Sequence, residues 1–143
     1  MKEDHMKTLI VFYSFSGRTR ATAQELAAKE AYDVTEIKTV KNVGKLKAYT
    51  AGIFASIKGK TWPILPIDAE LAGYDRLVLL APVWAGNPPP AFNAFLQQLP
   101  SGKTIAIKMV SASGKSDCRE RLEAIITKKG CTLESVTDIQ AQR

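Results

Sequence analysis

The chain alternates between short, continuously apolar runs and longer stretches in which apolar residues recur every three or four positions. Residues 8–13 and 77–81 are apolar runs bounded by polar or glycine-containing stretches, a pattern typical of strands buried on both faces of a parallel sheet. Between and after these runs, spacings of three and four residues predict amphipathic helices. The pattern therefore predicts an α/β protein.

The full pattern predicts five strands and four helices in alternation. Strands are expected over residues 8–13, 32–37, 76–81, 104–110 and 132–139, and helices over residues 18–29, 45–58, 90–99 and 117–129. Right-handed crossovers then give a doubly wound, five-stranded parallel sheet, for which we predict the order 2-1-3-4-5. The first helix is expected alone on one face. No helix is expected after the last strand, because this strand ends close to residue 143.

Alternation along the last two predicted strands indicates that the face carrying the first helix is only half covered. We place Leu133 and Ile139 on the opposite, helix-covered face. The half-covered face is expected to carry Ala106, Val110 and Val136. These side chains could seat a second subunit, so a monomer and a homodimer both remain open.

Composition and charge narrow the class of protein. The chain has 143 residues, is 45% hydrophobic and carries a formal charge of +6, which fits one soluble domain over residues 7–143 after a disordered tail at residues 1–6. The longest nearly apolar run, residues 77–85, is far short of the roughly 20 residues that cross a bilayer. No signal peptide is recognisable, so we expect a cytoplasmic protein without a membrane span.

The few cysteine and histidine residues exclude several kinds of catalytic site. Cys118 and Cys131 belong to no C-x-x-C pair, so a redox dithiol and a zinc site are both unsupported, and we expect reduced core thiols. His5 is the only histidine and lies in the predicted tail. A Ser-His or Cys-His catalytic pair within one chain is therefore excluded, and no metal site is predicted.

Three loops are expected to meet at the carboxyl ends of the strands, where ligands of such sheets bind. Residues 14–19 supply three hydroxyls, a glycine, a cation and the start of a helix, which favours a phosphate site over a simple helix cap. Residues 83–88 present Trp84, whose flat apolar face suits ring stacking better than a core position. Residues 111–116 form the third loop.

At this point the residues resemble a known family. The segment Tyr13-Ser14-Phe15-Ser16-Gly17-Arg18-Thr19, with Ala23 and Leu26 on the helix behind it, resembles the phosphate-loop signature of flavodoxins. The segment Pro82-Val83-Trp84-Ala85-Gly86 looks like the second, flavin-flanking loop of that family. The resemblance covers residues 7–139 in element order and implies a flavodoxin-like fold that lacks the usual C-terminal helix. It also implies non-covalently bound FMN and a role in electron transfer.

The resemblance also implies roles for individual residues. The ribityl phosphate would be held by hydroxyls and backbone amides of Ser14, Ser16, Gly17, Arg18 and Thr19. Trp84 would stack on the isoalloxazine, within a flanking loop made of Pro82, Val83, Trp84, Ala85, Gly86 and Asn87. The pyrimidine side of the ring would be lined by Ser111, Ala112, Ser113, Gly114 and Lys115.

The charge around these loops departs from that of acidic flavodoxins. No Asp or Glu occurs between Asp75 and Asp117, while Arg18 and Lys115 add cations. We therefore expect a bound flavin to be easier to reduce, and its electron source to be an acidic redox partner or NAD(P)H. Between Glu36 and Asp68 there are six lysines and no acid, at positions 38, 41, 45, 47, 58 and 60. Most such runs are solvated helix faces, but an acidic protein or nucleotide phosphates could bind there, and Trp62 could lie beside the flavin.

Other functions fit less well. Three Gly-Lys-Thr/Ser segments occur, but a phosphate-binding NTPase loop needs a glycine five residues earlier, where Phe54, Gln97 and Met109 stand instead. A cofactor-free receiver module needs acids at the strand ends, which are missing. No nucleic-acid reading motif occurs. An electron carrier and an NAD(P)H-dependent flavin or quinone oxidoreductase both remain open.

Overall fold

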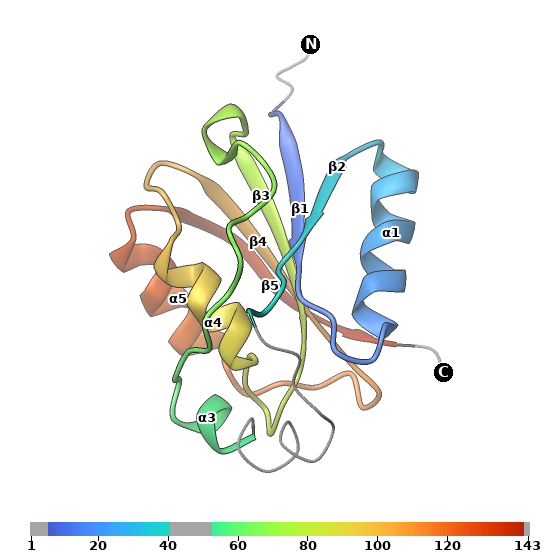
Figure 1. The fold of residues 1–143 in the computed structure, drawn as a ribbon, viewed down its shortest axis with the longest axis vertical. Coiled ribbons are helices and arrows are strands. Elements are labelled where there is room, and N and C mark those ends of the chain that lie inside the picture. Colours follow the sequence, from blue (N-terminus) through green and yellow to red (C-terminus); the bar gives the residue numbers. More distant parts are fainter. Residues whose placement is uncertain (1–5, 41–52, 142–143) are drawn as a thin grey trace.

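The computed structural model describes residues 6–40 and 53–141, and these form a five-stranded sheet flanked by helices (Figure 1). The strands are β1 (Thr8–Phe12), β2 (Asp33–Glu36), β3 (Arg76–Pro82), β4 (Thr104–Ser111) and β5 (Thr132–Gln140). Their order is β2-β1-β3-β4-β5, and every neighbouring pair is parallel. The predicted doubly wound topology is confirmed.

Helices follow the strands as the apolar spacings indicate. They are α1 (Arg18–Glu30), α3 (Ile53–Ile57), α4 (Pro90–Gln97) and α5 (Arg119–Lys128), with a short 3-10 helix, η2 (Leu71–Gly73). Pro90 occupies the first turn of α4, where its missing N–H costs no helical hydrogen bond. The helix predicted over residues 45–58 falls mostly outside the described residues, and only its end is seen as α3.

The two faces of the sheet carry different helices. One face packs β1, β3 and β4 against α4 and α5, with Phe92 and Phe95 fully buried between them. The other face packs against α1, whose Ala23 and Ala27 are small enough for the helix to approach the strands closely. Figure 1 shows α1 on one side of the sheet and α4 and α5 on the other. The predicted division of these helices between the faces is confirmed.

The face assignment predicted for β5 is wrong beyond its second residue. The register between β4 and β5 shifts, so that Ile105 faces Leu133 while the next residue of β4 faces Ser135. One extra residue, Glu134, therefore reverses the side of the sheet to which later side chains point. As a result Val136 packs in the α4–α5 core and Ile139 packs on the α1 side, the opposite of the prediction.

The α1 side of β4 does not offer the apolar surface that we expected. Ala106 and Val110 do lie on this face, but each is only 1% exposed. Neighbouring side chains, including Ile139, already cover them. These two residues are therefore not available to seat a second subunit.

Among the described helices, none is long and apolar enough to span a bilayer.

Polar side chains connect the amino ends of the strands. The guanidinium of Arg76 donates from Nε and Nη2 to the two carboxylate oxygens of Glu134, at 2.8 and 2.7 Å. This pairing lowers the pKa of Glu134, because it stabilises the charged carboxylate. Lys103 Nζ donates to the carbonyl of Leu71 at 2.9 Å and to that of Tyr74 at 2.6 Å. These contacts link β3, β5 and the loops at this end of the sheet.

Candidate functional site

The loop between β1 and α1 is held by a single hydroxyl. Ser14 Oγ accepts hydrogen bonds from the backbone N–H of Gly17 at 3.0 Å and from that of Arg20 at 3.2 Å. Gly17 precedes the helix with a φ of 97°, which L side chains rarely adopt, so glycine is required for this turn. Ser14 therefore shapes this loop.

The first turn of α1 leaves donors free at the surface. The backbone N–H groups of Arg18 and Thr19 have no hydrogen-bond partner among the described residues. No acidic residue lies in this turn. Free N–H groups and the helix dipole both favour an anion here. Thr19 is 2% exposed, and its side chain lines the cavity described below, so a hydroxyl is added to these donors.

The loop after β3 is a tight turn in a strained conformation. Trp84 and Asn87 exchange backbone hydrogen bonds of 2.8 and 3.0 Å. Between them Ala85 and Gly86 both have positive φ, at 51° and 81°, the pattern of a type I′ turn. The N–H of Asp117 donates to the Gly86 carbonyl at 2.7 Å and ties this turn to the following loop. The turn is thus fixed in one position beside the cavity.

Trp84 lies at the centre of an aromatic cluster. Its ring is met edge-on by Tyr13, Phe15 and Trp62, with centroid separations of 6.2, 5.7 and 5.8 Å. Edge-to-face contacts of this kind are favourable and hold the indole in place. Trp84 also packs against the α4–α5 core and remains partly exposed. Trp62, which the sequence suggested could lie beside the flavin, thus contacts Trp84 in the second of the three loops.

The loop after β4 is stabilised mainly by its own serines. Ser111 Oγ accepts from the N–H of Gly114 at 3.0 Å, and Ser113 Oγ accepts from that of Lys115 at 3.3 Å. Ser116 Oγ donates to the carboxylate of Asp138 at 2.5 Å. The Lys115 side chain is exposed at the edge of the cavity.

The three loops enclose a cavity of about 510 Å³, which we call the first cavity. This volume lies in the range of small-molecule sites. Eleven of the site residues predicted from the sequence line this cavity: Ser16, Arg18, Thr19, Pro82, Val83, Trp84, Gly86, Ser111, Ala112, Ser113 and Lys115. The structure thus brings together residues from all three loops, as the topology predicts.

Five predicted site residues do not line the first cavity: Ser14, Gly17, Ala85, Asn87 and Gly114. They form the turns that carry the lining residues, through the contacts given above. Two lining residues were missed, Phe15 and Val110. Phe15 had a signal in the sequence, since it is the only apolar residue in a polar loop. No Asp or Glu lines this cavity among the described residues, whereas Arg18 and Lys115 do.

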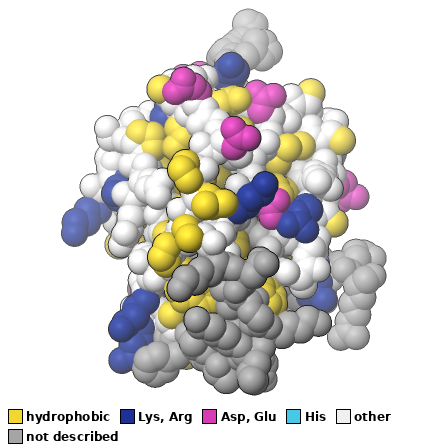
Figure 2. Space-filling view, viewed as in Figure 1, with side chains coloured by type: hydrophobic (Ala, Val, Ile, Leu, Met, Phe, Trp, Pro, Cys, Tyr) yellow, Lys and Arg dark blue, Asp and Glu magenta, His cyan; other side chains and the backbone are white. Residues whose placement is uncertain are grey.

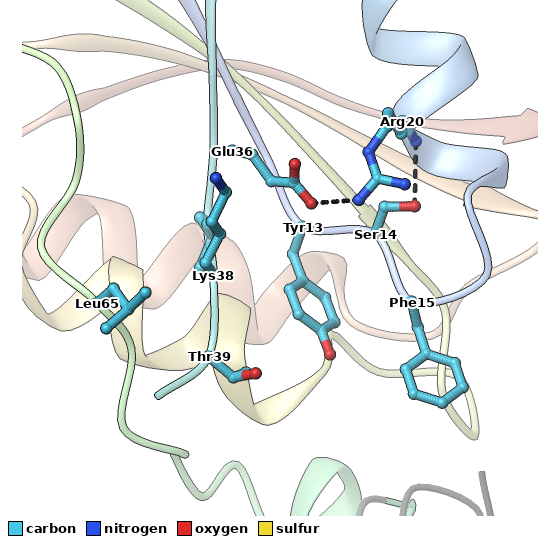
Figure 3. A pocket seen from close by; sticks show the side chains of 9 residues that line it. Tyr13, Ser14, Phe15, Arg20, Glu36, Lys38, Thr39 and Leu65 are labelled. Atoms are coloured by element: carbon cyan, nitrogen blue, oxygen red, sulfur yellow. Dashed lines mark hydrogen bonds and ion pairs between the residues drawn. The ribbon is translucent and has the colours of Figure 1, made fainter. Parts of the chain in front are cut away.

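A second cavity, of about 550 Å³, lies on the other side of the first loop (Figure 3). Phe15 lines both cavities. Arg20 and Glu36 form an ion pair at 2.5 Å on its wall, and Lys38 projects from the end of β2 on the same side. Burial, together with the nearby Glu36 carboxylate, raises the pKa of Tyr13 to about 12. Its phenol therefore stays protonated and able to donate a hydrogen bond.

The lysine-rich segment of the sequence is only partly seen. Lys38 lines the second cavity, while Lys58 and Lys60 are exposed near the end of α3. The other three lysines, at positions 41, 45 and 47, lie outside the described residues. Among the residues that the structure describes, no group of acidic, histidine or cysteine side chains could hold a metal ion.

Solved structures with the same fold include three flavoproteins. A flavoprotein from Lactobacillus acidophilus, in complex with FMN, aligns with a TM-score of 0.77 over 92% of this chain and 92% of its own, at 22% identity. A Bacteroides eggerthii flavoprotein gives 0.79 over 93% and 87%, at 18% identity. The two-electron reduced flavodoxin of Megasphaera elsdenii gives 0.56 over 93% and 85%, at 17% identity. No protein-family model and no curated protein matches the sequence. The chain therefore has the flavodoxin-like fold that the resemblance implies.

Proposed function

We propose that this chain, which has the flavodoxin-like fold, binds FMN in the first cavity and transfers electrons through it. The observation that carries the proposal is the juxtaposition of two features in one cavity. Free backbone donors and a cation at the start of α1 suit a phosphate, and an aromatic wall at Trp84 and Phe15 suits a flat ring. The solved Lactobacillus acidophilus flavoprotein, which contains FMN, has the same fold.

The lining residues fit the two ends of this ligand. Ser16, Arg18 and Thr19 would hold the phosphate through two hydroxyls, backbone N–H groups and a guanidinium, and Ser14 and Gly17 would shape the loop. At the other end, the turn that contains Trp84 and Gly86 would flank the ring, and residues 111–115 would lie along its polar edge.

Bound FMN supplies one- and two-electron chemistry, and the protein controls its potential and access. Arg18 and Lys115 line the cavity and no acid does, among the described residues. Positive charge favours the more negatively charged, reduced flavin, so we propose a potential above that of acidic flavodoxins. A redox titration measures this directly, and a potential as low as that of acidic flavodoxins would contradict the charge argument.

The same charges suggest the nature of the redox partner. Exposed cations at the cavity edges, Lys115 and Lys38, would attract an acidic protein surface or the phosphates of NAD(P)H. A cytoplasmic location is part of this proposal. It is supported by Cys118 and Cys131, which are free thiols, as expected in a reducing compartment.

The proposal is tested by comparing FMN with riboflavin, which lacks the phosphate. The purified protein should bind FMN, and Arg18→Glu should weaken FMN by at least about tenfold while changing riboflavin little, because only FMN presents an anion to this residue. Arg119→Glu makes the same charge change outside the cavity and serves as the control. Absence of FMN binding by calorimetry, or an equal loss for both ligands, would contradict the assignment.

A carrier and an enzyme are separated by one kinetic experiment. The FMN-loaded protein is mixed with NADPH or NADH without oxygen, and the flavin absorbance is followed. We propose a carrier, for which bleaching by either nucleotide alone is slow. Rapid bleaching would instead support an NAD(P)H-dependent oxidoreductase.

A further inference from the structure

The second cavity has the features of a ligand site that neither the fold nor the first cavity explains. It measures about 550 Å³, similar to the first, and it lies between the first loop, the end of β2 and the segment around Leu65. Ion pairing of Arg20 with Glu36 neutralises those two charges. Among the described lining residues, the charge that remains is that of the Lys38 amine, which makes no hydrogen bond or ion pair with the described part of the chain.

The rest of the lining is apolar or a hydrogen-bond donor. Ile37 and Phe15 contribute apolar surface, and Leu65 is 42% exposed although it is a large hydrophobic residue. Figure 3 shows the Tyr13 phenol oxygen pointing toward the end of the cavity where Thr39 and Phe15 lie. That phenol has no hydrogen-bond partner among the described residues. Among the described residues, the lining thus combines an apolar wall, a neutral donor and one cation without a side-chain partner.

The surface view supports the same combination of groups. In Figure 2, basic side chains flank an acidic one on this face of the molecule, and hydrophobic side chains lie next to them. The second cavity is lined by the same kinds of side chain: the basic Arg20 and Lys38, the acidic Glu36 and the hydrophobic Leu65. Apolar surface beside a cation that has no partner among the described residues suits a ligand that carries both a ring and an anionic group.

We propose that the second cavity binds a small aromatic molecule that carries an anionic group. The ring would lie against Phe15 and Leu65, and the anion would be held by Lys38 and the Tyr13 hydroxyl. Because Phe15 also lines the first cavity, the ligand would lie one side chain away from the proposed flavin. The role of this ligand as a partner of the flavin therefore rests on the proposed function. Binding of the ligand to the second cavity does not.

Two kinds of ligand combine a ring with an anionic group in this way: a nicotinamide nucleotide and an acidic quinone. The probes are therefore NADPH and naphthoquinone-2-sulfonate, with uncharged menadione for comparison. Each is titrated into the ¹⁵N-labelled protein, with and without FMN. We expect at least one of the two anionic probes to shift the amide signals of Ile37, Lys38 and Leu65, both with and without FMN. The probe that shifts them shows which kind of ligand the second cavity binds.

Matched charge variants test the assignment of Lys38. Lys38→Glu should weaken the anionic probe about fivefold or more and leave menadione nearly unchanged. Lys60→Glu makes the same change at an exposed lysine that lines neither cavity, and it should have less than about a twofold effect. The amide spectrum of each variant also reports whether it is folded.

Three results would overturn the proposal: no shifts at millimolar probe, shifts confined to the first cavity, or equal weakening by the two lysine variants. A second apolar variant, Leu65→Ser, at an exposed position, should weaken all three probes and leave FMN affinity unchanged. If the protein does not bind FMN, the proposed function fails but this proposal is still tested. The probe titration without FMN still measures binding to the second cavity.

Discussion

At the amino ends of the strands the polar groups described above are paired within the chain, whereas at the carboxyl ends two backbone donors and one cation have no partner among the described residues. Arg76 meets Glu134 with two hydrogen bonds, and Lys103 caps two carbonyls. In contrast, the N–H groups of Arg18 and Thr19 and the amine of Lys38 make no contact of this kind with the described residues.

Backbone geometry does not distinguish the two ends. Gly17, Ala85 and Gly86 have positive φ at the carboxyl end, and Ala31, Gly102 and Gly130 have positive φ just before β2, β4 and β5. The difference lies in pairing, because unpaired donors cost stability and persist only where the surrounding structure compensates. This chain therefore pairs its polar groups at one end of the sheet and leaves donors available to a ligand at the other end.

Trp84→Ala should have the largest effect, because it removes the centre of the aromatic cluster at the carboxyl end. We expect a loss of about 2–3 kcal/mol in the free energy of unfolding, below the full cost of a buried tryptophan since the ring is partly exposed. Flavin fluorescence at saturating FMN should rise, because a stacked indole quenches it. Denaturation and emission spectra measure the two effects, and Trp62→Phe is the control. Unchanged emission would mean that Trp84 does not stack on the flavin.

Thr19→Val should separate ligand binding from stability. The substitution keeps the buried shape but removes a hydroxyl that lines the first cavity. Loss of a hydrogen bond to a charged phosphate costs about 1.5–3 kcal/mol, so FMN affinity should fall on the order of tenfold to a hundredfold. Thr22→Val is the matched control, because that hydroxyl donates to the Arg18 carbonyl within the helix. Similar FMN affinities for the two variants in calorimetry would remove Thr19 from the site.

Arg76→Met, at the amino end of the sheet, should lower stability without changing FMN affinity, the reverse of the effect expected for Thr19→Val. Its apolar stem is kept but the two hydrogen bonds to Glu134 are lost, and we expect the free energy of unfolding to fall by about 1 kcal/mol. FMN affinity should be unchanged, because neither cavity is lined by this residue. Urea denaturation and an FMN titration on the same sample check both statements. A marked loss of FMN affinity would break the division between the two ends.

The smallest effect is expected in the pH dependence of stability. Hydrogen bonds from Arg76 lower the pKa of folded Glu134 below its usual value of 4.5. This carboxylate therefore stabilises the fold above about pH 4.5, and the contribution is lost as the pH falls through the lowered folded pKa. In Glu134→Gln the contribution is absent, so the difference in unfolding free energy between the two proteins should shrink on acidification. A difference that stays constant as the pH falls well below 4.5 would contradict the pairing.

The sequence alone determined the strand order and the convergence of three loops. Apolar runs at residues 8–13 and 77–81 and the spacing of the helices are local features, and crossover handedness is general, so together they leave few topologies. For the same reason the residues of the first cavity were largely predictable. Each loop is recognised by its own chemistry, and the topology brings the loops to one edge.

The face of the sheet to which each side chain points, and the contacts between residues far apart in the sequence, depend on the tertiary structure. The register shift at Glu134 depends on how β5 pairs with β4, and it reverses Val136 and Ile139 relative to simple alternation. Likewise, the meeting of Trp62 with Trp84, and of Arg20 with Glu36, joins residues on different elements. Such contacts arise from packing between distant segments, to which local spacing is blind, and they create the second cavity and fix the walls of the first.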